Sequence, residues 1–189
     1  KKGKLIIRAE GGLSFPLYEK EAAKYRLTEG GTLTEQEWNE ICSEILEKRA
    51  KRRAMYILQR MERTECQLRR KLQENGYPEE IVQCAIDYVK SFHYVDDYRY
   101  ACTYIRYHQT EKSRLQLKMK LYERGVASDL IEQALEDEYS GEEEQLIDRL
   151  LEKKHYDAET MDQKEKQRIY QYLMRRGFRP ETIRHRMGI

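Results

Sequence analysis

The chain repeats a glycine-centred pattern three times, and this repetition constrains its fold more than any other feature. In each copy a leucine and three polar or charged residues precede a glycine, and a new apolar run follows. Gly76, Gly125 and Gly177 are 49 and 52 residues apart. A period near 50 residues indicates one supersecondary unit per copy. The copies read LQENGYPEEIV (72–82), LYERGVASDLI (121–131) and LMRRGFRPETI (173–183).

The pattern around each glycine is typical of a helix end. If Gly76 adopts the left-handed conformation just past a helix, Leu72 and Tyr77 form the hydrophobic pair of a Schellman motif. Three matches at the same offsets predict three such ends. The corresponding pairs in the later copies are Leu121 with Val126 and Leu173 with Phe178.

Each of these helices also has a start signal. Thr64, Ser113 and Asp162 are spaced by 49 and 49 residues, and a Glu or Gln stands three positions after each. This spacing predicts capping boxes, the third with Asp in place of Ser or Thr. The third copy has three more residues between cap and glycine, so we expect its middle helix to be nearly a turn longer.

Apolar residues at helical spacing precede each cap and follow each glycine, which predicts three helices per repeat. We therefore expect an all-α fold, a tandem array of three three-helix repeats with a small N-terminal extended or β-hairpin segment plus helix as a cap. The predicted boundaries are 1–50 for the cap and 51–97, 98–141 and 142–189 for the repeats.

The cap differs in composition from the repeats. Apolar triplets at 5–7 and 15–17 flank Gly11 and Gly12, which indicates a hairpin, and a short helix is expected around 19–25. Thr34 and Glu37 then form a capping box for another helix. That helix either runs on through the basic stretch 48–53 into the first repeat or breaks there.

Charge is abundant and segregated along the chain. The 36 Lys and Arg nearly balance the 34 Asp and Glu, for a net +2. Residues 48–71 nevertheless hold 10 basic and 2 acidic residues (+8), and 74–97 hold 1 and 6 (−5). The alternation continues with 7 and 2 in 98–125 (+5), 1 and 9 in 126–149 (−8), and 8 and 2 in 164–186 (+6).

This charge segregation has two possible explanations. Basic residues before each glycine and acids after it favour the helix dipoles, which explains about half of the bias. The dipole does not explain the basic residues of 49–63, and successive basic faces suit a polyanion or an acidic protein surface. Charge alone leaves a solvated face and a functional surface equally open.

Motifs of several enzyme classes are absent from the sequence. It has no GxxxxGK[ST] loop, no GxGxxG after a strand, no HExxH and no GxSxG. The four His lack metal-like spacing, and the four Cys include no CxxC, so we expect neither a metal site nor a disulfide framework. The sequence predicts a non-enzymatic protein without cofactor, metal or small-molecule ligand, with reduced thiols in the cytoplasm. No apolar run is long enough to cross a membrane.

Two further groups of residues have both a structural and a functional interpretation. His93 with Asp96 and Asp97 could serve as an acid–base or ligand set, but a capping Asp for a helix starting near Tyr98 is the better interpretation. The tyrosines could stack on bases, although tyrosines at helical spacing more often lie in a core with the hydroxyl at its rim. These tyrosines are Tyr94, Tyr98, Tyr100, Tyr104 and Tyr107.

The repeats resemble a known family. The string FHYVDDYRYACTYI (92–105) resembles the G-Y-[IV]-D-D-x-x-[FY]-A signature of the RecX regulators of bacterial recombination, with His93 in place of the usual Gly. CQLRRKLQENGYPEEIV (66–82) is similar to that family's E-L-x-x-K-L-x-x-x-G-[FY] segment. KSRLQLKMKLYERGV (112–126) is similar to its second unit, although Lys112 and Ser113 stand where a Gly-Pro or a similar pair is usual. The third copy and the N-terminal segment also fit, so the resemblance spans nearly the whole chain.

The resemblance implies a non-enzymatic modulator of the RecA recombinase. Its partner would be RecA and the RecA filament on single-stranded DNA, where it would inhibit strand exchange, ATP hydrolysis and co-protease activity. Basic residues chosen by charge and repeat position are the candidate contacts to RecA or DNA. They are Arg52, Arg53, Arg69, Arg70, Lys71, Arg114, Lys118, Arg124, Arg175 and Arg176.

Two other functions remain open at this point. The three-helix units could bind DNA directly, as helix-turn-helix proteins do, and steep salt dependence would then be expected. The near-zero net charge and the acidic third helices count against that interpretation. The array could also be a helical scaffold for an unrelated protein partner.

Overall fold

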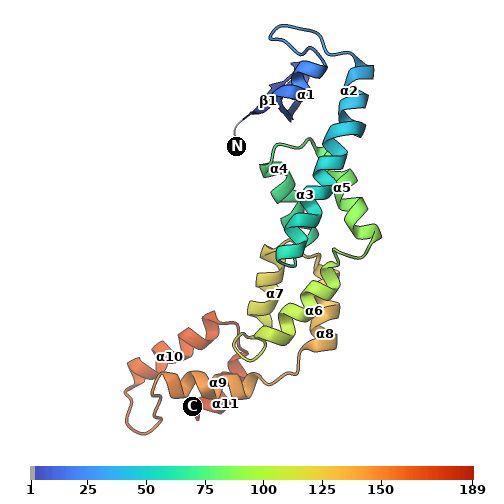
Figure 1. The fold of residues 1–189 in the computed structure, drawn as a ribbon. Helices are drawn as coiled ribbons and strands as arrows, with labels where there is room; N and C mark the ends of the chain where they lie inside the picture. Colours follow the sequence, from blue (N-terminus) through green and yellow to red (C-terminus); the bar gives the residue numbers. More distant parts are fainter. Residues whose placement is uncertain (1–2) are drawn as a thin grey trace. The chain divides into compact units, whose positions relative to one another are not determined.

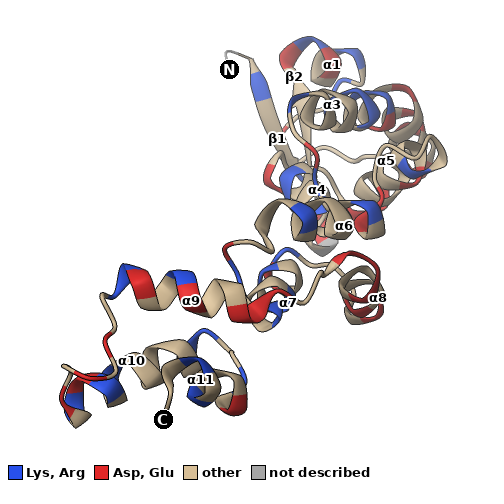
Figure 2. Cartoon of the chain, turned by 90° about the horizontal axis from the view of Figure 1, so that it is seen from below, with Lys and Arg blue, Asp and Glu red and all other residues tan. Residues whose placement is uncertain are grey.

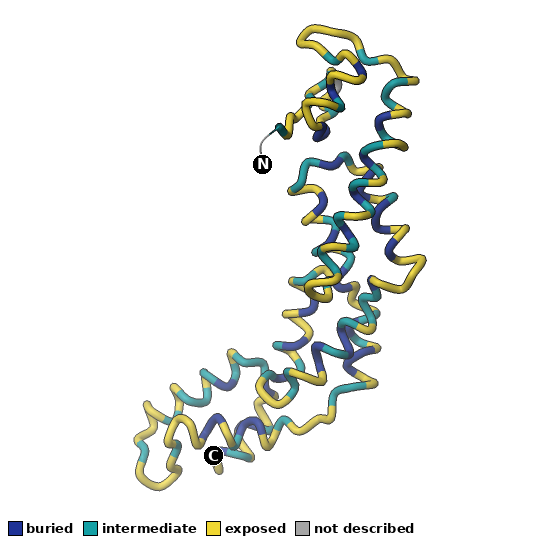
Figure 3. Tube along the Cα trace, viewed as in Figure 1, coloured by how far each residue is buried: buried dark blue, intermediate teal, exposed yellow. Residues whose placement is uncertain are grey.

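The computed structural model describes residues 3–189, which form two compact units with the boundary between Asp96 and Asp97. In the described residues the regular structure consists of helices and one two-stranded sheet (Figure 1). The three repeats and the small N-terminal hairpin expected from the sequence are therefore confirmed. Buried residues lie along the inner faces of the helices within each unit (Figure 3).

The N-terminal segment is a hairpin followed by a short helix. Strand β1 (Lys4–Arg8) pairs antiparallel with β2 (Ser14–Tyr18), with Leu5 opposite Leu17 and Ile7 opposite Phe15. A 3-10 turn (Glu10–Gly12) connects the strands, and α1 (Glu19–Lys24) follows. Phe15 and Leu17 are fully buried, so this segment contributes to the core of the first unit.

One long helical stretch joins this cap to the first repeat. Helix α2 (Glu35–Ile41) passes into a π-helical segment (Cys42–Leu46) and then α3 (Glu47–Arg60) without a break. The helix expected after Thr34 therefore runs on through the basic stretch. Thr34 caps it as expected, because its hydroxyl accepts the Glu37 N–H and the Glu37 carboxylate accepts the Thr34 N–H.

The first repeat consists of α3, α4 (Glu65–Glu74) and α5 (Glu79–Ser91). Three contacts tie the N-terminal segment to it. The Arg49 guanidinium donates to the Pro16 carbonyl at 3.1 Å and pairs with Glu21, and Lys4 Nζ donates to the Asn75 carbonyl at 2.8 Å. The cap and the first repeat consequently share one core.

The second unit contains the other two repeats. The second repeat consists of α6 (Asp97–His108), α7 (Arg114–Glu123) and α8 (Ser128–Glu138). The third consists of α9 (Glu143–Lys153), α10 (Gln163–Arg175) and α11 (Pro180–Met187). Helix α10 has 13 residues where α4 and α7 have 10, which confirms the longer middle helix.

The glycine turns have the predicted geometry. Gly76, Gly125 and Gly177 have φ of +88°, +81° and +83°, a region that costs a residue with a Cβ more than glycine. Across each turn the N–H after the glycine bonds the leucine carbonyl that closes the Schellman motif. These bonds are Tyr77 to Leu72 (3.5 Å), Val126 to Leu121 (3.2 Å) and Phe178 to Leu173 (3.4 Å).

The predicted caps also form. Thr64, Ser113 and Asp162 each accept the N–H three residues on, and the last two complete a full capping box. His93, where the RecX signature has Gly, adopts φ of +56°. A glycine would take this conformation without strain, so the substitution changes the residue but keeps the turn.

A candidate binding surface on the first repeat

Five of the ten basic candidates form ion pairs within their own repeat. Arg69 pairs with Glu65 and Glu79 across α4 and α5, and it also donates to Gln83. Such pairs hold two helices together and leave less charge for a partner. The other paired candidates are Arg70 and Lys71, which share Glu74, and Arg114 and Lys118, which share Glu132.

Two further candidates lie on aromatic rings. The Arg124 guanidinium carbon is 4.2 Å from the Tyr104 ring centroid, and Arg124 donates to the Tyr100 hydroxyl at 2.5 Å. The Arg176 guanidinium carbon is 5.0 Å from the Tyr172 ring centroid. A cation on an aromatic face is attracted by the ring quadrupole, so these arginines contribute to packing in the second unit.

The remaining candidates are Arg175, exposed near the end of α10, and Arg52 and Arg53 on α3. Arg53 is only half-exposed. Its guanidinium carbon lies 5.3 Å from the Tyr56 ring centroid, and its buried Nε has no hydrogen-bond partner in the described part of the chain. Arg52 is exposed and enters no ion pair identified among residues 3–189.

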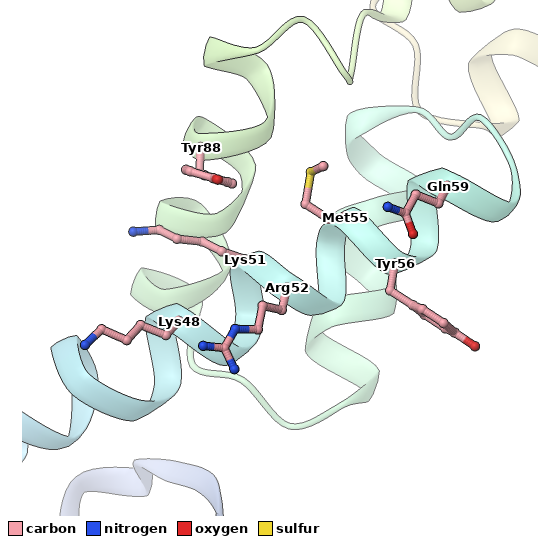
Figure 4. A pocket seen from close by; sticks show the side chains of 7 residues that line it. All are labelled: Lys48, Lys51, Arg52, Met55, Tyr56, Gln59 and Tyr88. Carbon is pink, nitrogen blue, oxygen red and sulfur yellow. The ribbon is translucent and has the colours of Figure 1, made fainter.

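Arg52 lies at an open cavity of about 370 Å³ between α3 and α5. Three cations gather on one side of it, and Met55 and Tyr88 lie between the two helices (Figure 4). Most of the lining comes from one face of α3, because the positions follow helical spacing. The lining residues are Lys48, Lys51, Arg52, Met55, Tyr56, Gln59 and Tyr88.

Two of the three cations at this cavity form ion pairs of their own, so Arg52 is the one whose charge no identified ion pair within residues 3–189 offsets. Lys48 Nζ is 2.6 Å from Glu44, and Lys51 Nζ is 3.2 Å from Glu47, each an i,i+4 pair on the same helix. Partial burial lowers the pKa of Lys51, but hydrogen bonds to Glu47 and Cys84 outweigh it and raise that pKa above its ordinary value. Lys51 is therefore charged at neutral pH.

An exposed row of aromatic rings extends from the cavity. Lys51 Nζ lies 5.6 Å from the centroid of the Tyr88 ring. The Tyr88 and Phe92 centroids are 5.1 Å apart, edge to face, and the Phe92 and Tyr94 rings stack at 5.9 Å. All three rings are exposed, Phe92 to 53%. In the sequence these rings stand at 88, 92 and 94, in the last turn of α5 and just beyond its end.

The matching surface of the second repeat lacks the first ring of the aromatic row. Counted from the glycine, Asp137 occupies the position of Tyr88, and it accepts a hydrogen bond from the Tyr98 hydroxyl. Nearby, Arg106 pairs with Glu138. Basic residues lie on α3 and on α6, the first helices of the two repeats, and acidic residues lie on α8 (Figure 2). The aromatic row beside the cations thus belongs to the first repeat, whereas a basic first helix is common to both.

The tyrosines expected at the rim of a core divide into two groups. Tyr104 is 8% exposed, and Tyr98 and Tyr100 pack against the same core with their hydroxyls hydrogen-bonded. Tyr94 and Tyr107 are exposed. Helix α6 begins at Asp97, next to Asp96, where the sequence indicated a capping Asp.

The described part of the chain has neither a metal-binding cluster nor a membrane-spanning helix. Residues 3–189 contain no group of three or more His, Cys, Asp or Glu side chains placed to hold a metal ion. Over the same residues, no helix combines the length and apolar character that crossing a bilayer requires.

Comparison with known families matches the repeats one by one. The models of the first, second and third three-helix domains of RecX match residues 50–88, 96–135 and 142–186. The chain belongs to the RecX family. The match follows the order of the repeats and covers more than half of the chain.

Relatives of this RecX-family chain carry the name regulatory protein RecX. The protein of Caldanaerobacter subterraneus subsp. tengcongensis is 29% identical over 191 residues, which cover 100% of this chain and 94% of the relative. That of Clostridium acetobutylicum is 30% identical over 135 residues, which cover 68% of this chain and 63% of the relative.

Two solved RecX structures share the fold. A crystal structure of regulatory protein RecX covers 100% of this chain and 94% of its own, with a TM-score of 0.70 and 24% identity. RecX from Lactobacillus salivarius covers 76% of this chain and 95% of its own, with a TM-score of 0.61 and 19% identity.

Proposed function

We propose that this RecX-family chain is a non-enzymatic cytoplasmic regulator that binds the RecA recombinase and its filament on single-stranded DNA. Binding inhibits strand exchange, ATP hydrolysis and co-protease activity. Membership of the RecX family is the observation that carries this proposal, because the relatives are named regulatory proteins.

The charge distribution supports the proposal. A partner built from repeating subunits suits an array of repeats, since many modest contacts add up along it. Of the neighbouring cations on α3, Arg52 and Arg53 enter no ion pair identified among residues 3–189, whereas Lys48 and Lys51 pair with Glu44 and Glu47. Exposed Arg175 is a second point of contact, whereas Arg69, Arg114 and Arg124 stabilise the repeats themselves.

The test is ATP hydrolysis by RecA filaments on single-stranded DNA, titrated with the protein. Binding to free DNA is measured in parallel at two salt concentrations. We expect hydrolysis to fall at protein levels that barely coat free DNA. Unchanged hydrolysis at saturating protein would refute the function, and inhibition that appears only where free DNA is coated would reduce it to competition for the strand.

A charge-reversal variant connects the function to the α3 surface. We expect Lys51→Glu with Arg52→Glu to weaken inhibition at least tenfold, because both cations lie at the cavity. The matched control is Arg8→Glu with Lys20→Glu, which reverses two exposed charges elsewhere in the first unit. Equal loss in both variants would indicate a general charge effect and not a contact at α3.

A further inference from the structure

The surface between α3 and α5 combines two kinds of groups that suit one class of ligand. Lys48, Lys51 and Arg52 provide positive charge at the cavity. Tyr88 lines the same cavity and begins the row of exposed rings that continues through Phe92. Cations bind phosphates and aromatic faces stack on bases, so the surface can bind both parts of a nucleotide.

We infer that this surface binds single-stranded nucleic acid, with phosphates on the α3 cations and bases on the α5 aromatic row. The inference rests on the proposed function and deepens it, because it assigns this surface to the strand inside the filament and not to the recombinase. The volume of about 370 Å³ is at the lower end of the range for small-ligand sites and suits a single nucleotide.

The aromatic row favours a single strand over a duplex. Bases in a duplex are stacked on one another, and only their edges are accessible in the grooves. Aromatic side chains can reach base faces only where the strand is unpaired. Tyr88 and Phe92 expose their rings beside the cations. A bound duplex would leave these rings without a base to stack on.

The same rings favour a nucleic acid over an acidic protein segment. An acidic segment would pair with Lys51 and Arg52 but would leave three adjacent rings in water. Exposed apolar groups that lie together generally mark an interaction site. The second repeat, with Asp137 in the position of Tyr88, keeps the same fold without these rings, so the fold does not require them.

Two double variants separate stacking from charge. The stacking variant is Tyr88→Ala with Phe92→Ala, and the cation variant is Lys51→Gln with Arg52→Gln. Affinity for fluorescent oligo(dT) is measured over a series of salt concentrations. We expect the stacking variant to lose at least about fivefold in affinity at every salt concentration with an unchanged salt slope.

The cation variant should change the slope instead. Each phosphate contact on a single strand contributes about 0.7 to the slope of log K against log salt, so losing two cations should reduce the slope by about 1.4. The matched controls are Tyr107→Ala with Tyr122→Ala for exposed aromatics and Arg8→Gln with Lys20→Gln for exposed cations. Both controls should bind oligo(dT) as the unaltered protein does.

All substituted positions are at least partly exposed, and circular dichroism checks that each variant is folded. Unchanged oligo(dT) affinity in both double variants overturns the inference. If these variants lose RecA inhibition but keep oligo(dT) affinity, the surface contacts the recombinase, the inference fails and the proposed function stands. If oligo(dT) binding changes as expected but the unaltered protein does not inhibit RecA, the nucleic-acid site stands and the proposed function fails.

Discussion

The first and second repeats have the same frame but different surfaces. Both turn at a left-handed glycine, and both place two leucines of the middle helix in the core, Leu68 and Leu72 in α4 and Leu117 and Leu121 in α7. Between the first and third helices, however, the first repeat places a cation over a tyrosine ring and the second bonds a tyrosine hydroxyl to an aspartate. The difference shows that buried residues and turns specify the unit, while its surface is free to specialise.

Of the turn glycines Gly76 and Gly177, we expect substitution of Gly177, in the second unit, to cost more stability. Gly177→Ala would place a Cβ 2.7 Å from Leu115 Cβ, whereas at Gly76 the nearest atom, Ile6 Cδ1, is 3.6 Å away. Both changes lower the free energy of unfolding by about 1–2 kcal/mol, because they place a side chain at positive φ. The overlap at Gly177 adds about 1–3 kcal/mol. Urea unfolding should therefore show a larger loss of stability for Gly177→Ala.

The two units can be followed separately in that experiment. Trp38, the single tryptophan, packs in the core of the first unit, and circular dichroism reports on both. Adding Leu115→Gly to Gly177→Ala removes the overlapping side chain, including its Cβ, so Gly177→Ala should cost less stability in that background than alone. Equal costs of Gly177→Ala with and without Leu115 would contradict the steric explanation.

Exchanging the Lys51–Tyr88 pair of the first repeat and the Tyr98–Asp137 pair of the second tests whether these side chains alone determine oligo(dT) binding. We expect Lys51→Tyr with Tyr88→Asp, which gives the first repeat the pair of the second, to weaken oligo(dT) binding about tenfold or more. The reciprocal change, Tyr98→Lys with Asp137→Tyr, should leave the second unit folded and increase affinity modestly.

Affinity is measured by fluorescence anisotropy, and thermal unfolding serves as the fold control. The comparison between repeats would be wrong if the first exchange left binding intact. It would also be wrong if the first exchange unfolded the repeat, because the frame is expected to tolerate either pair.

A smaller difference between the repeats should appear with pH. Burial lowers the pKa of His108, and nearby Lys112 lowers it further, while Glu111 opposes the shift and Arg124 adds slightly to it. The unfolded chain therefore takes up the proton first as pH falls below about 6.5, and the second unit loses stability between that pH and the pKa of folded His108.

His108→Met should remove this component, because a methionine side chain does not titrate. The measurement is the thermal midpoint from circular dichroism between pH 5 and 8, about the range in which histidine titrates. The variant should lose less stability on acidification than the unaltered protein. An identical pH dependence in both would show that other groups control it.

The sequence predicts the frame well because its signals are local. A glycine turn needs only its own left-handed backbone and a leucine four residues earlier, and a cap needs two side chains three residues apart. Both kinds of signal therefore appear in the sequence at fixed spacing. Ser113 and Gly76 are examples, and the structure has both as predicted.

The candidate contacts were harder to predict, because charge in a sequence does not show which charges are already paired. Arg69 is neutralised by Glu79, ten residues away on the next helix, and Arg114 by Glu132, eighteen residues away. Lys48 and Lys51 could have joined the candidate list, since they share a helix face with Arg52. The aromatic part of the surface depends on the packing of α5 beside α3, and no local sequence pattern predicts that packing.

The π-helical segment Cys42–Leu46 acts as a phase correction in the long helix of the first unit. Ile41 and Leu46 are five residues apart and both fully buried, although in a regular α-helix that interval would turn Leu46 well away from the face of Ile41. Beyond it, Ala50 and Ala54 continue the buried stripe at intervals of four. The wider π-helical turn thus accommodates one additional residue. A chain without that residue would keep the same buried stripe on a regular α-helix.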